Sequence, residues 1–389
     1  MTSFPVLREL PAEPAVTVIL PAFNAAGYVA DAVSSVRRST YAHWRCVVVD
    51  DGSTDRSLAV ARAAAADDAR FVFTAQANGG HIAALNHAAR WVTGDIVAFL
   101  DNDDTFLPDK LGRVVSTFRQ RPASGLVTHR LYVADERLAV IGVTPLTDRL
   151  VDGDLRPQMR RQAAGDPRLG VTSGMALRRE IFEMIFPADP AIERFPDELI
   201  RRIAPVAAEV ASCDEPLGIR RTHGRNQSDE AGDELADYVR RSLASYRLIR
   251  ACQVRVASQL GIELSASDLD LDLMQATLDR LERSDDAPRR RASVLASPHF
   301  RELPALRRIY WRIALSAPHR ALPAMLSQLY GVSNLTLLLN RHRMRRLRRS
   351  GDVPRAAPGG ELPMWDVARR ALPLSRGTRT PTARTPATG

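Results

Sequence analysis

Three carboxylates follow directly after a short apolar run, within residues 99–104. The predicted strand over 96–100 would place these acids at the carboxyl edge of an α/β sheet, where ligands bind in this class of fold. Asp101 and Asp103 are spaced i, i+2, so both can approach one hard cation such as Mg²⁺ or Mn²⁺, which prefers oxygen ligands shared with phosphate. The alternative is an Asp-rich turn that caps the helix beginning near Pro108. The motif predicts either a divalent-metal site or a helix cap.

Two further acids, Asp50 and Asp51, end the predicted strand over 46–49 and are followed by Gly-Ser-Thr-Asp. Helix capping accounts for the Ser, the Thr or the last Asp. It does not account for two acids at a strand tip, where we expect them to hydrogen-bond a nucleotide base or ribose. The sequence has no glycine-rich phosphate loop of the GxGxxG or GxxxxGK[ST] type, so a bound diphosphate has to be met by a metal ion and side chains.

Alternating apolar runs and helical periodicity over residues 16–100 predict βα units and a mainly parallel sheet of the α/β class. The predicted strands are 16–20, 46–49, 71–74 and 96–100, and the predicted helices are 29–36, 55–66 and 81–92. Two later strands, 126–133 and 171–177, are separated by a polar stretch at 148–166 that we expect to be a surface excursion. This arrangement brings the strand-end acids to one edge of the sheet.

The pattern changes after the α/β region. Residues 235–256 predict one long amphipathic helix, and the helical period continues beyond it. After residue 349 the chain turns to Arg, Pro, Thr, Gly and Ala, a composition typical of disorder. We therefore predict an N-terminal leader (1–14), an α/β domain (15–230), an α-helical C-terminal region (231–349) and a disordered tail (350–389).

The composition narrows the class of protein. The 389-residue chain has a net charge of +9 and one lysine, Lys110, so its positive charge comes from arginines gathered toward the C-terminal third, which does not predict a nucleic-acid partner. Three widely spaced cysteines give neither a disulfide framework nor a zinc spacing, which favours a cytoplasmic setting. We find no signal-peptide pattern, and no apolar run reaches the roughly 18 residues of a membrane span, so we expect a soluble or surface-bound protein.

Five segments together resemble the family-2 glycosyltransferases, which have the GT-A fold. They are residues 21–24 (Pro-Ala-Phe-Asn), 50–55, 78–86, 94–95 and 99–104. Their order and spacing match over residues 15–230, and the combination is more specific than any one segment. The resemblance implies an enzyme that transfers a sugar, with inversion, from a nucleotide-diphosphate sugar to a hydroxyl acceptor. It also implies that Asp51 contacts the base, Asp101 the ribose or sugar, and Asp103 the metal, Mg²⁺ or Mn²⁺.

Residues 220–226 resemble the family's Tyr-Arg-x-His-x-x-Asn segment, which folds back over the diphosphate, with Arg220 in place of the usual aromatic residue. The resemblance implies that His223 is an additional metal ligand and that Arg221 pairs with phosphate. A histidine in a polar loop can also be merely solvated. The implied metal ligands are Asp101, Asp103 and His223, and the implied donor-binding residues are Pro21, Phe23, Asn24, Asp50, Asp51, Asn78, Gly79, Asn86, Asp101 and Arg221.

Residues 194–199 stand where the family carries its catalytic acid, after a stretch at 171–182 that resembles the acceptor side of the family's site. An inverting displacement needs a carboxylate opposite the leaving group to take the proton of the acceptor hydroxyl. The resemblance implies that Asp197 has this role, with Glu198 as the second choice. The alternative is that Asp197 only caps the helix that continues through Arg202.

The C-terminal third has no comparable signature. The acids at 268–272 lack the glycine and terminal Glu of a calcium loop, so they predict a helix N-terminus rather than a site. Residues 303–349 combine apolar faces with many arginines. This pattern is typical either of helices bound to an anionic membrane surface or of a lid packed on the α/β domain.

We expect the acceptor to be a cell-surface glycan or a glycolipid precursor, including lipid-linked acceptors, reached in the cytoplasm or at the inner face of the plasma membrane. Two other functions are open. A sugar-1-phosphate nucleotidyltransferase would use a similar domain, although residues 21–24 stand in place of its Gly-rich first loop. A non-catalytic sugar-nucleotide-binding or scaffold protein on the same fold would be expected to have lost the acids that are present here.

Overall fold

Nine strands form one sheet within the residues that the computed structural model describes, which are 7–144, 149–161, 167–193, 195–223, 235–266, 268–303 and 305–316. The strands are β1 (Val16–Ala22), β2 (Trp44–Asp51), β3 (Phe71–Gln76), β4 (Ile96–Phe99), β5 (Thr105–Phe106), β6 (Ser124–Ala134), β7 (Val140–Thr144), β8 (Met175–Arg178) and β9 (Glu209–Arg221). Their order is β3-β2-β1-β4-β8-β6-β9-β5, and β7 pairs with β6. The first four strands are parallel, as predicted for residues 16–100. The second half of the sheet is mixed, because β8 runs antiparallel to both β4 and β6.

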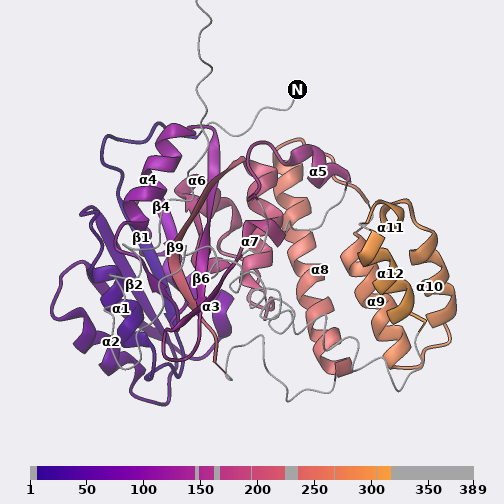
Figure 1. Ribbon diagram of the computed structural model, residues 1–389, viewed down its shortest axis with the longest axis horizontal. Coiled ribbons are helices and arrows are strands. Elements are labelled where there is room, and N and C mark those ends of the chain that lie inside the picture. The colour runs from indigo at the N-terminus through magenta and orange to yellow at the C-terminus, as the bar shows by residue number, and fades with distance from the viewer. Residues whose placement is uncertain are drawn as a thin grey trace, which may run out of the picture.

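Helices cover both faces of this sheet (Figure 1). One face carries α1 (Val29–Arg37), α2 (Ser57–Ala65) and α4 (Lys110–Gln120), and the other carries α3 (Gly80–Ala89), α6 (Arg179–Ile185) and α7 (Pro196–Ala207). Successive strand residues alternate between the two cores: Ile19 packs with α3 and α6, whereas Val18 and Leu20 pack with α1 and α4. Because both faces are buried, these strands are continuous apolar runs.

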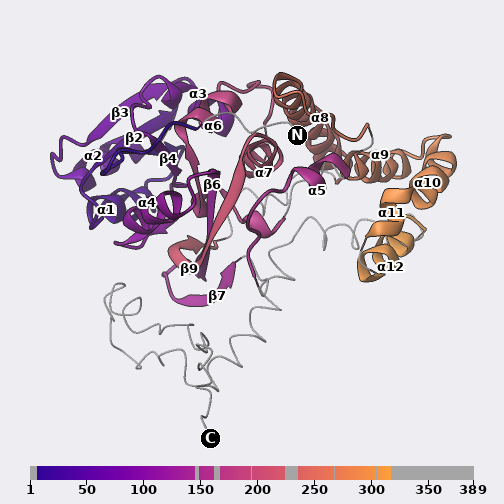
Figure 2. The same ribbon diagram turned by 90° about the horizontal axis from the view of Figure 1, so that it is seen from above.

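The first of the C-terminal helices packs against the layer formed by α3, α6 and α7. The long helix predicted over 235–256 is confirmed as α8 (Leu235–Gln259), whose Ile249 and Val256 belong to the same core as α6 and α7. It is followed by α9 (Leu269–Leu281), α10 (Ala287–Ala296), α11 (Pro298–Glu302) and α12 (Ala305–Ala314). These four helices share a small core that includes Phe300 and Trp311, and they lie beside α8 on the side away from β1–β4 (Figure 2).

The structure differs from the sequence prediction in the stretch 148–166 and in the N-terminal leader, and it does not describe several predicted boundaries. The polar stretch predicted as a surface excursion contains α5 (Arg156–Arg161), whose Met159 is fully buried against Val206, so this part is not a surface excursion. The predicted leader packs on the domain through Leu7 and Leu10. The predicted boundaries at residues 230 and 349, the tail 350–389 and most of the predicted interfacial segment 303–349 lie outside the described residues. Among the described helices, none is both long and apolar enough to cross a membrane.

Candidate functional site

The acidic loop after β4 is held by the 3-10 turn η2 (Thr172–Gly174). The backbone N–H of Asp101 donates to Ser173 Oγ at 3.0 Å, which fixes the loop against the start of β8. The Oδ1 atom of Asp101 is buried and has no hydrogen-bond partner in the described part of the chain. His81, at the start of α3, places its Nε2 3.8 Å from this oxygen, which is too long for a hydrogen bond. The loop therefore presents a buried carboxylate oxygen that accepts no hydrogen bond from the described residues.

The second acid of the motif meets the end of β9. His223 Nε2 lies 3.1 Å from Asp103 Oδ2, and the imidazole ring stacks on Tyr28 with ring centres 4.4 Å apart. The structure thus brings together Asp103 and His223, two of the residues predicted to hold a metal, from positions 120 residues apart in the sequence.

Burial and like charge act together on this loop. Burial raises the pKa of the Asp101 carboxyl, and the nearby Asp103 and Asp197 carboxylates raise it further, while His81 and Arg220 act in the opposite direction. Burial likewise raises the pKa of Asp104 well above its ordinary value, with Asp103 and Asp101 adding to it. The acids that follow β4 therefore lie within electrostatic reach of one another and of Asp197 at the start of α7, and their combined negative charge favours a cation.

The donor set fits a divalent cation shared with a phosphate. In the described residues, no three His, Cys, Asp or Glu side chains converge to hold a metal ion by themselves. Mg²⁺ is usually held by only one or two carboxylates, with water and substrate phosphate oxygens completing its shell. Asp101, with its unpartnered Oδ1, and Asp103 match that arrangement, and His223 lies beside Asp103.

The acids at the end of β2 divide into two roles. Asp51 accepts hydrogen bonds from Gln76 Nε2 at 2.7 Å, Gly79 N at 2.9 Å and Gly80 N at 2.8 Å. These bonds shape the loop before α3, so the structure uses Asp51, predicted to contact the base, to build the site. Asp50 instead has a buried Oδ1 without a hydrogen-bond partner among the described residues, and it lines a pocket of about 480 Å³ with Ser53.

The end of β1 is tied to the turn after β2. Asn24 Oδ1 accepts from the N–H of Thr54 at 2.9 Å and from its hydroxyl at 3.1 Å. The carbonyl of Pro21 accepts from Asn102 Nδ2 at 3.2 Å, while the ring of Phe23 is 43% exposed. Of the predicted donor residues in this segment, Pro21 and Asn24 therefore join the loops together, and Phe23 faces solvent.

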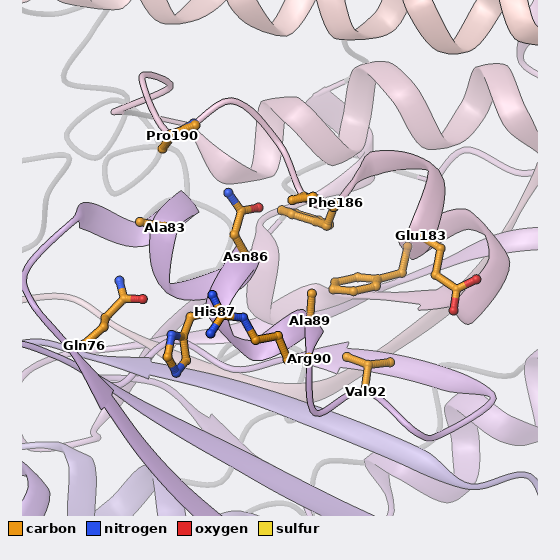
Figure 3. A pocket seen from close by; sticks show the side chains of 12 residues that line it. Gln76, Ala83, Asn86, His87, Ala89, Arg90, Val92, Glu183, Phe186 and Pro190 are labelled. Atoms are coloured by element: carbon orange, nitrogen blue, oxygen red, sulfur yellow. The ribbon is translucent and has the colours of Figure 1, made fainter.

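Two predicted donor residues have other partners. Asn86 is bonded on both sides of its amide to the backbone of Ala188, as Nδ2 donates to the carbonyl at 2.7 Å and Oδ1 accepts from the N–H at 2.8 Å. Figure 3 shows Asn86 directed from α3 toward the loop that carries Phe186 and Pro190, at a pocket of about 540 Å³. Arg221 Nη2 donates to Asp31 Oδ2 at 2.6 Å, and its guanidinium lies over Tyr28. Both side chains thus have protein partners in this structure, and their donor-binding roles stay predictions.

The two candidate bases lie in the first turn of α7. The residue at the N-cap position is Phe195, so the alternative that Asp197 caps the helix is wrong. Asp197 Oδ2 lies 2.9 Å from Arg201 Nη2, and its carboxylate is close enough to raise the pKa of Asp101. Glu198 is buried, and its oxygens accept from Arg201 and Arg202. Burial raises the pKa of Glu198, but the two guanidinium groups override it and hold the pKa below its ordinary value, which suits an ion-pair partner and not a base.

Sequence reasoning missed Lys110 and Ser173 as supports of the acidic loop. Lys110 is fully buried, its Nζ donates to the Ser173 carbonyl at 2.7 Å and lies 3.4 Å from the centre of the Phe106 ring. Burial lowers the pKa of Lys110 well below its ordinary value. The signal was present, because the single lysine of the chain follows the acidic motif by only a few residues.

Comparisons with known proteins identify the family of this chain. Residues 17–186 match the family model described as glycosyl transferase family 2. An uncharacterized glycosyltransferase of Nostoc sp. is 31% identical over 258 residues, which cover 64% of this chain and 79% of the relative.

Two other relatives match over shorter stretches. The putative teichuronic acid biosynthesis glycosyltransferase TuaG of Bacillus subtilis is 36% identical over 28% of this chain and 44% of its own length. The Escherichia coli UDP-Glc:alpha-D-GlcNAc-diphosphoundecaprenol beta-1,3-glucosyltransferase WfgD is 33% identical over 26% of this chain and 40% of its own length. The chain thus spans less than half of these two relatives.

Proposed function

We propose a reaction from a premise: the chain belongs to glycosyl transferase family 2 and has its GT-A fold. The chain moves a sugar, with inversion, from a metal-bound nucleotide-diphosphate donor to a hydroxyl acceptor. One observation carries the proposal. At the carboxyl edge of the sheet, the loop after β4 carries Asp103 and the Asp101 Oδ1, which has no hydrogen-bond partner among the described residues, and the Asp197 carboxylate is close enough to raise the pKa of Asp101. A transferase needs at that edge a cation site for the leaving diphosphate and a carboxylate for the acceptor proton.

The reaction divides between the two groups of acids. Asp101 and Asp103 would hold a divalent cation, Mg²⁺ or Mn²⁺, which neutralises the charge that builds up on the departing diphosphate. Asp197 accepts the proton of the acceptor hydroxyl. At the same time the hydroxyl oxygen forms a bond to the anomeric carbon of the donor sugar, and the bond between that carbon and the diphosphate oxygen breaks. Attack from the face opposite the leaving group inverts the configuration of that carbon.

The nucleoside is assigned to the β1 and β2 ends of the same edge. Asp50 supports this assignment, because its buried Oδ1 has no donor among the described residues and it lines the pocket next to Ser53. A ribose hydroxyl or a base N–H would supply the missing donor. Asn78 and Gly79 are exposed and belong to the loop that Asp51 orders.

We infer that the acceptor is a cell-surface glycan or a glycolipid precursor, in line with the names of the relatives. Family membership favours this role over the sugar-1-phosphate nucleotidyltransferase that the sequence left open. A non-catalytic scaffold is disfavoured by the presence of all five acids: Asp50, Asp51, Asp101, Asp103 and Asp197.

A thermal-shift screen of nucleotide diphosphates and nucleotide sugars with Mn²⁺ identifies the donor, because a ligand that binds only the folded state raises its stability by mass action. Calorimetry with the selected nucleotide diphosphate then tests the metal: we expect affinity to collapse with a chelator and in Asp103→Ala. Asp154→Ala is the matched control, since Asp152 and Asp154 have the same spacing but pair with Arg121 and Arg156. Undiminished affinity in Asp103→Ala and with chelator removes the metal from the proposal.

The base is tested separately. Asp197→Asn should keep donor affinity and lower turnover by a factor on the order of 10² to 10⁴, the usual range for loss of a general base. Full turnover in this variant would show that the base lies elsewhere.

A further inference from the structure

Arg202 is fully buried where α7 meets the C-terminal helices. Its Nε donates to Glu198 Oε2 at 3.2 Å, its Nη1 to Asp268 Oδ2 at 2.7 Å and its Nη2 to Asp270 Oδ2 at 2.6 Å. Helix α8 covers the group: the Tyr246 ring centre lies 4.8 Å from the guanidinium carbon, and Gln253 Nε2 donates to the Arg202 carbonyl at 2.8 Å. Burying a guanidinium costs free energy unless its hydrogen bonds to carboxylates are kept. The three carboxylates are therefore held in the positions where they accept from Arg202.

Glu198 connects Arg202 to the first turn of α7. One of its carboxylate oxygens accepts from Arg202 and the other from Arg201. Arg201 Nη2 lies 2.9 Å from Asp197 Oδ2, and its Nη1 donates to the carbonyl of Gly170 at 2.7 Å. A series of ion pairs therefore runs from α9 to Asp197. We call Asp268, Asp270, Arg202, Glu198 and Arg201 the Arg202 network.

The two helices that this network joins begin in different ways. The N-cap residue of α7, Phe195, has a left-handed backbone (φ 64°) and provides no side-chain hydrogen bond. Helix α9 has the opposite character, since Asp268 caps it by accepting from the N–H groups of Asp270 and Leu271. Asp268 therefore both caps α9 and accepts from Arg202, so the network is tied to the start of α9.

We propose that the C-terminal helices position the catalytic base, because α9 sets the orientation of the Asp197 carboxylate through the Arg202 network. Arg202 and Glu198 are positioning residues that touch no substrate in this account. The inference rests on the proposed role of Asp197 and goes beyond it, since it makes helices outside the α/β sheet part of the catalytic apparatus. A displacement of about 1 Å in a catalytic group can lower a rate on the order of 10²-fold.

The test uses Asp268→Asn and the double variant Asp268→Asn/Asp270→Asn. Asparagine caps a helix about as well as aspartate, so Asp268→Asn keeps Oδ1 as the cap of α9, while an amide NH2 replaces the Oδ2 that accepts from Arg202. Arg240→Gln is the matched control. It breaks an exposed pair between Arg240 of α8 and Glu282, the residue that follows α9, far from Asp197 in the sequence. Turnover is measured with the nucleotide sugar selected by the thermal-shift screen, and affinity by calorimetry with the matching nucleotide diphosphate and Mn²⁺.

We expect kcat to fall about 10- to 10²-fold in the double variant while the Kd of the nucleotide diphosphate stays unchanged. Arg240→Gln should keep the kcat of the wild type, as exposed pairs contribute little. Adding Asp268→Asn to Glu198→Gln should cost no further activity, because both changes break the same series. This coupling is a readout that a merely structural role would not give, and Glu198→Gln, Asp268→Asn and their combination supply it even if Asp268→Asn/Asp270→Asn does not fold.

Two results would overturn the inference. One is a double variant with the kcat of Arg240→Gln, and the other is a loss in Glu198→Gln/Asp268→Asn equal to the product of the single losses. In either case an inactive Asp197→Asn leaves the proposed function standing. A fully active Asp197→Asn refutes the base assignment itself, and the positioning role with it.

Discussion

Gly52 offers a quantitative test of how the donor edge is built. It follows Asp51 in the turn after β2 with a φ of +72°, and a Cβ added there would lie 2.6 Å from the backbone nitrogen of Asn78. Gly80 is the natural comparison, because its φ is +83° and a Cβ added there meets nothing within 4 Å. Alanine at either position suffers the strain of a left-handed backbone, but only Gly52→Ala also forces apart two loops.

The two costs can be estimated separately. A left-handed backbone costs a residue with a Cβ roughly 1–2 kcal/mol. Forcing an additional carbon into packed surroundings costs typically about 1–3 kcal/mol. We therefore expect Gly52→Ala to lower the free energy of unfolding by about 2–5 kcal/mol and Gly80→Ala by about 1–2 kcal/mol. For a domain of this size each kcal/mol corresponds to a shift of roughly 2–4 °C in Tm.

Urea unfolding of both variants at one temperature measures this difference. The Gly52→Ala contact involves backbone and not a flexible side chain, so the 77–80 loop has to move, and with it the Gly79 N–H that donates to Asp51. Nucleotide affinity should fall along with stability. Equal destabilisation of the two variants would refute the reasoning, because it would show that the loop yields to the added carbon at no cost.

Three further predictions concern other parts of the molecule. Asn86→Ala should lower the free energy of unfolding by about 1–3 kcal/mol and leave nucleotide affinity unchanged, because it removes two hydrogen bonds to the backbone of Ala188. Urea unfolding and calorimetry measure the two quantities, and a loss of affinity without a loss of stability would support the donor-binding role of Asn86. Stability should fall as the pH drops below 4.5, the ordinary pKa of Glu198, because the folded state holds this pKa lower and the unfolded chain takes up the proton first; Glu198→Gln should reduce that slope in urea titrations, and parallel curves would contradict it. The segment 303–349 should bring the full chain down with anionic vesicles at low salt and release it at high salt; a chain that stays in the supernatant at both salt concentrations favours a packed lid.

The elements that the sequence predicts are those with a local pattern, either a continuous apolar run or a helical period. Strands such as β1 and β4 are buried on both faces, so they read as apolar runs, and the long period of α8 is equally visible. The convergence of Asp50 and Asp101 followed from topology, since parallel strands end at the same edge of a sheet.

The partners of individual polar side chains were not predictable in the same way. Asn86 bonds Ala188 across 102 positions, and Arg221 bonds Asp31 across 190. Such pairs depend on how loops and helices close over the sheet, and they leave no periodic trace in the sequence. The acids at 268–272 illustrate the limit, because their place at a helix start was predicted but the buried Arg202 that they hold was not.

The burial of Lys110 makes the protein unusual in covalent chemistry. Since this is the only lysine in the chain and it is fully buried, amine-directed reagents find no lysine side chain on the folded surface. Acylation of Lys110 requires its Nζ to break the hydrogen bond to the Ser173 carbonyl. Ser173 belongs to the turn that also binds the backbone of Asp101. The rate of labelling at this single lysine, which mass spectrometry separates from labelling of the N-terminal amine, would therefore report how often the acidic loop opens, and a ligand that closes the loop would register as protection without any engineered probe.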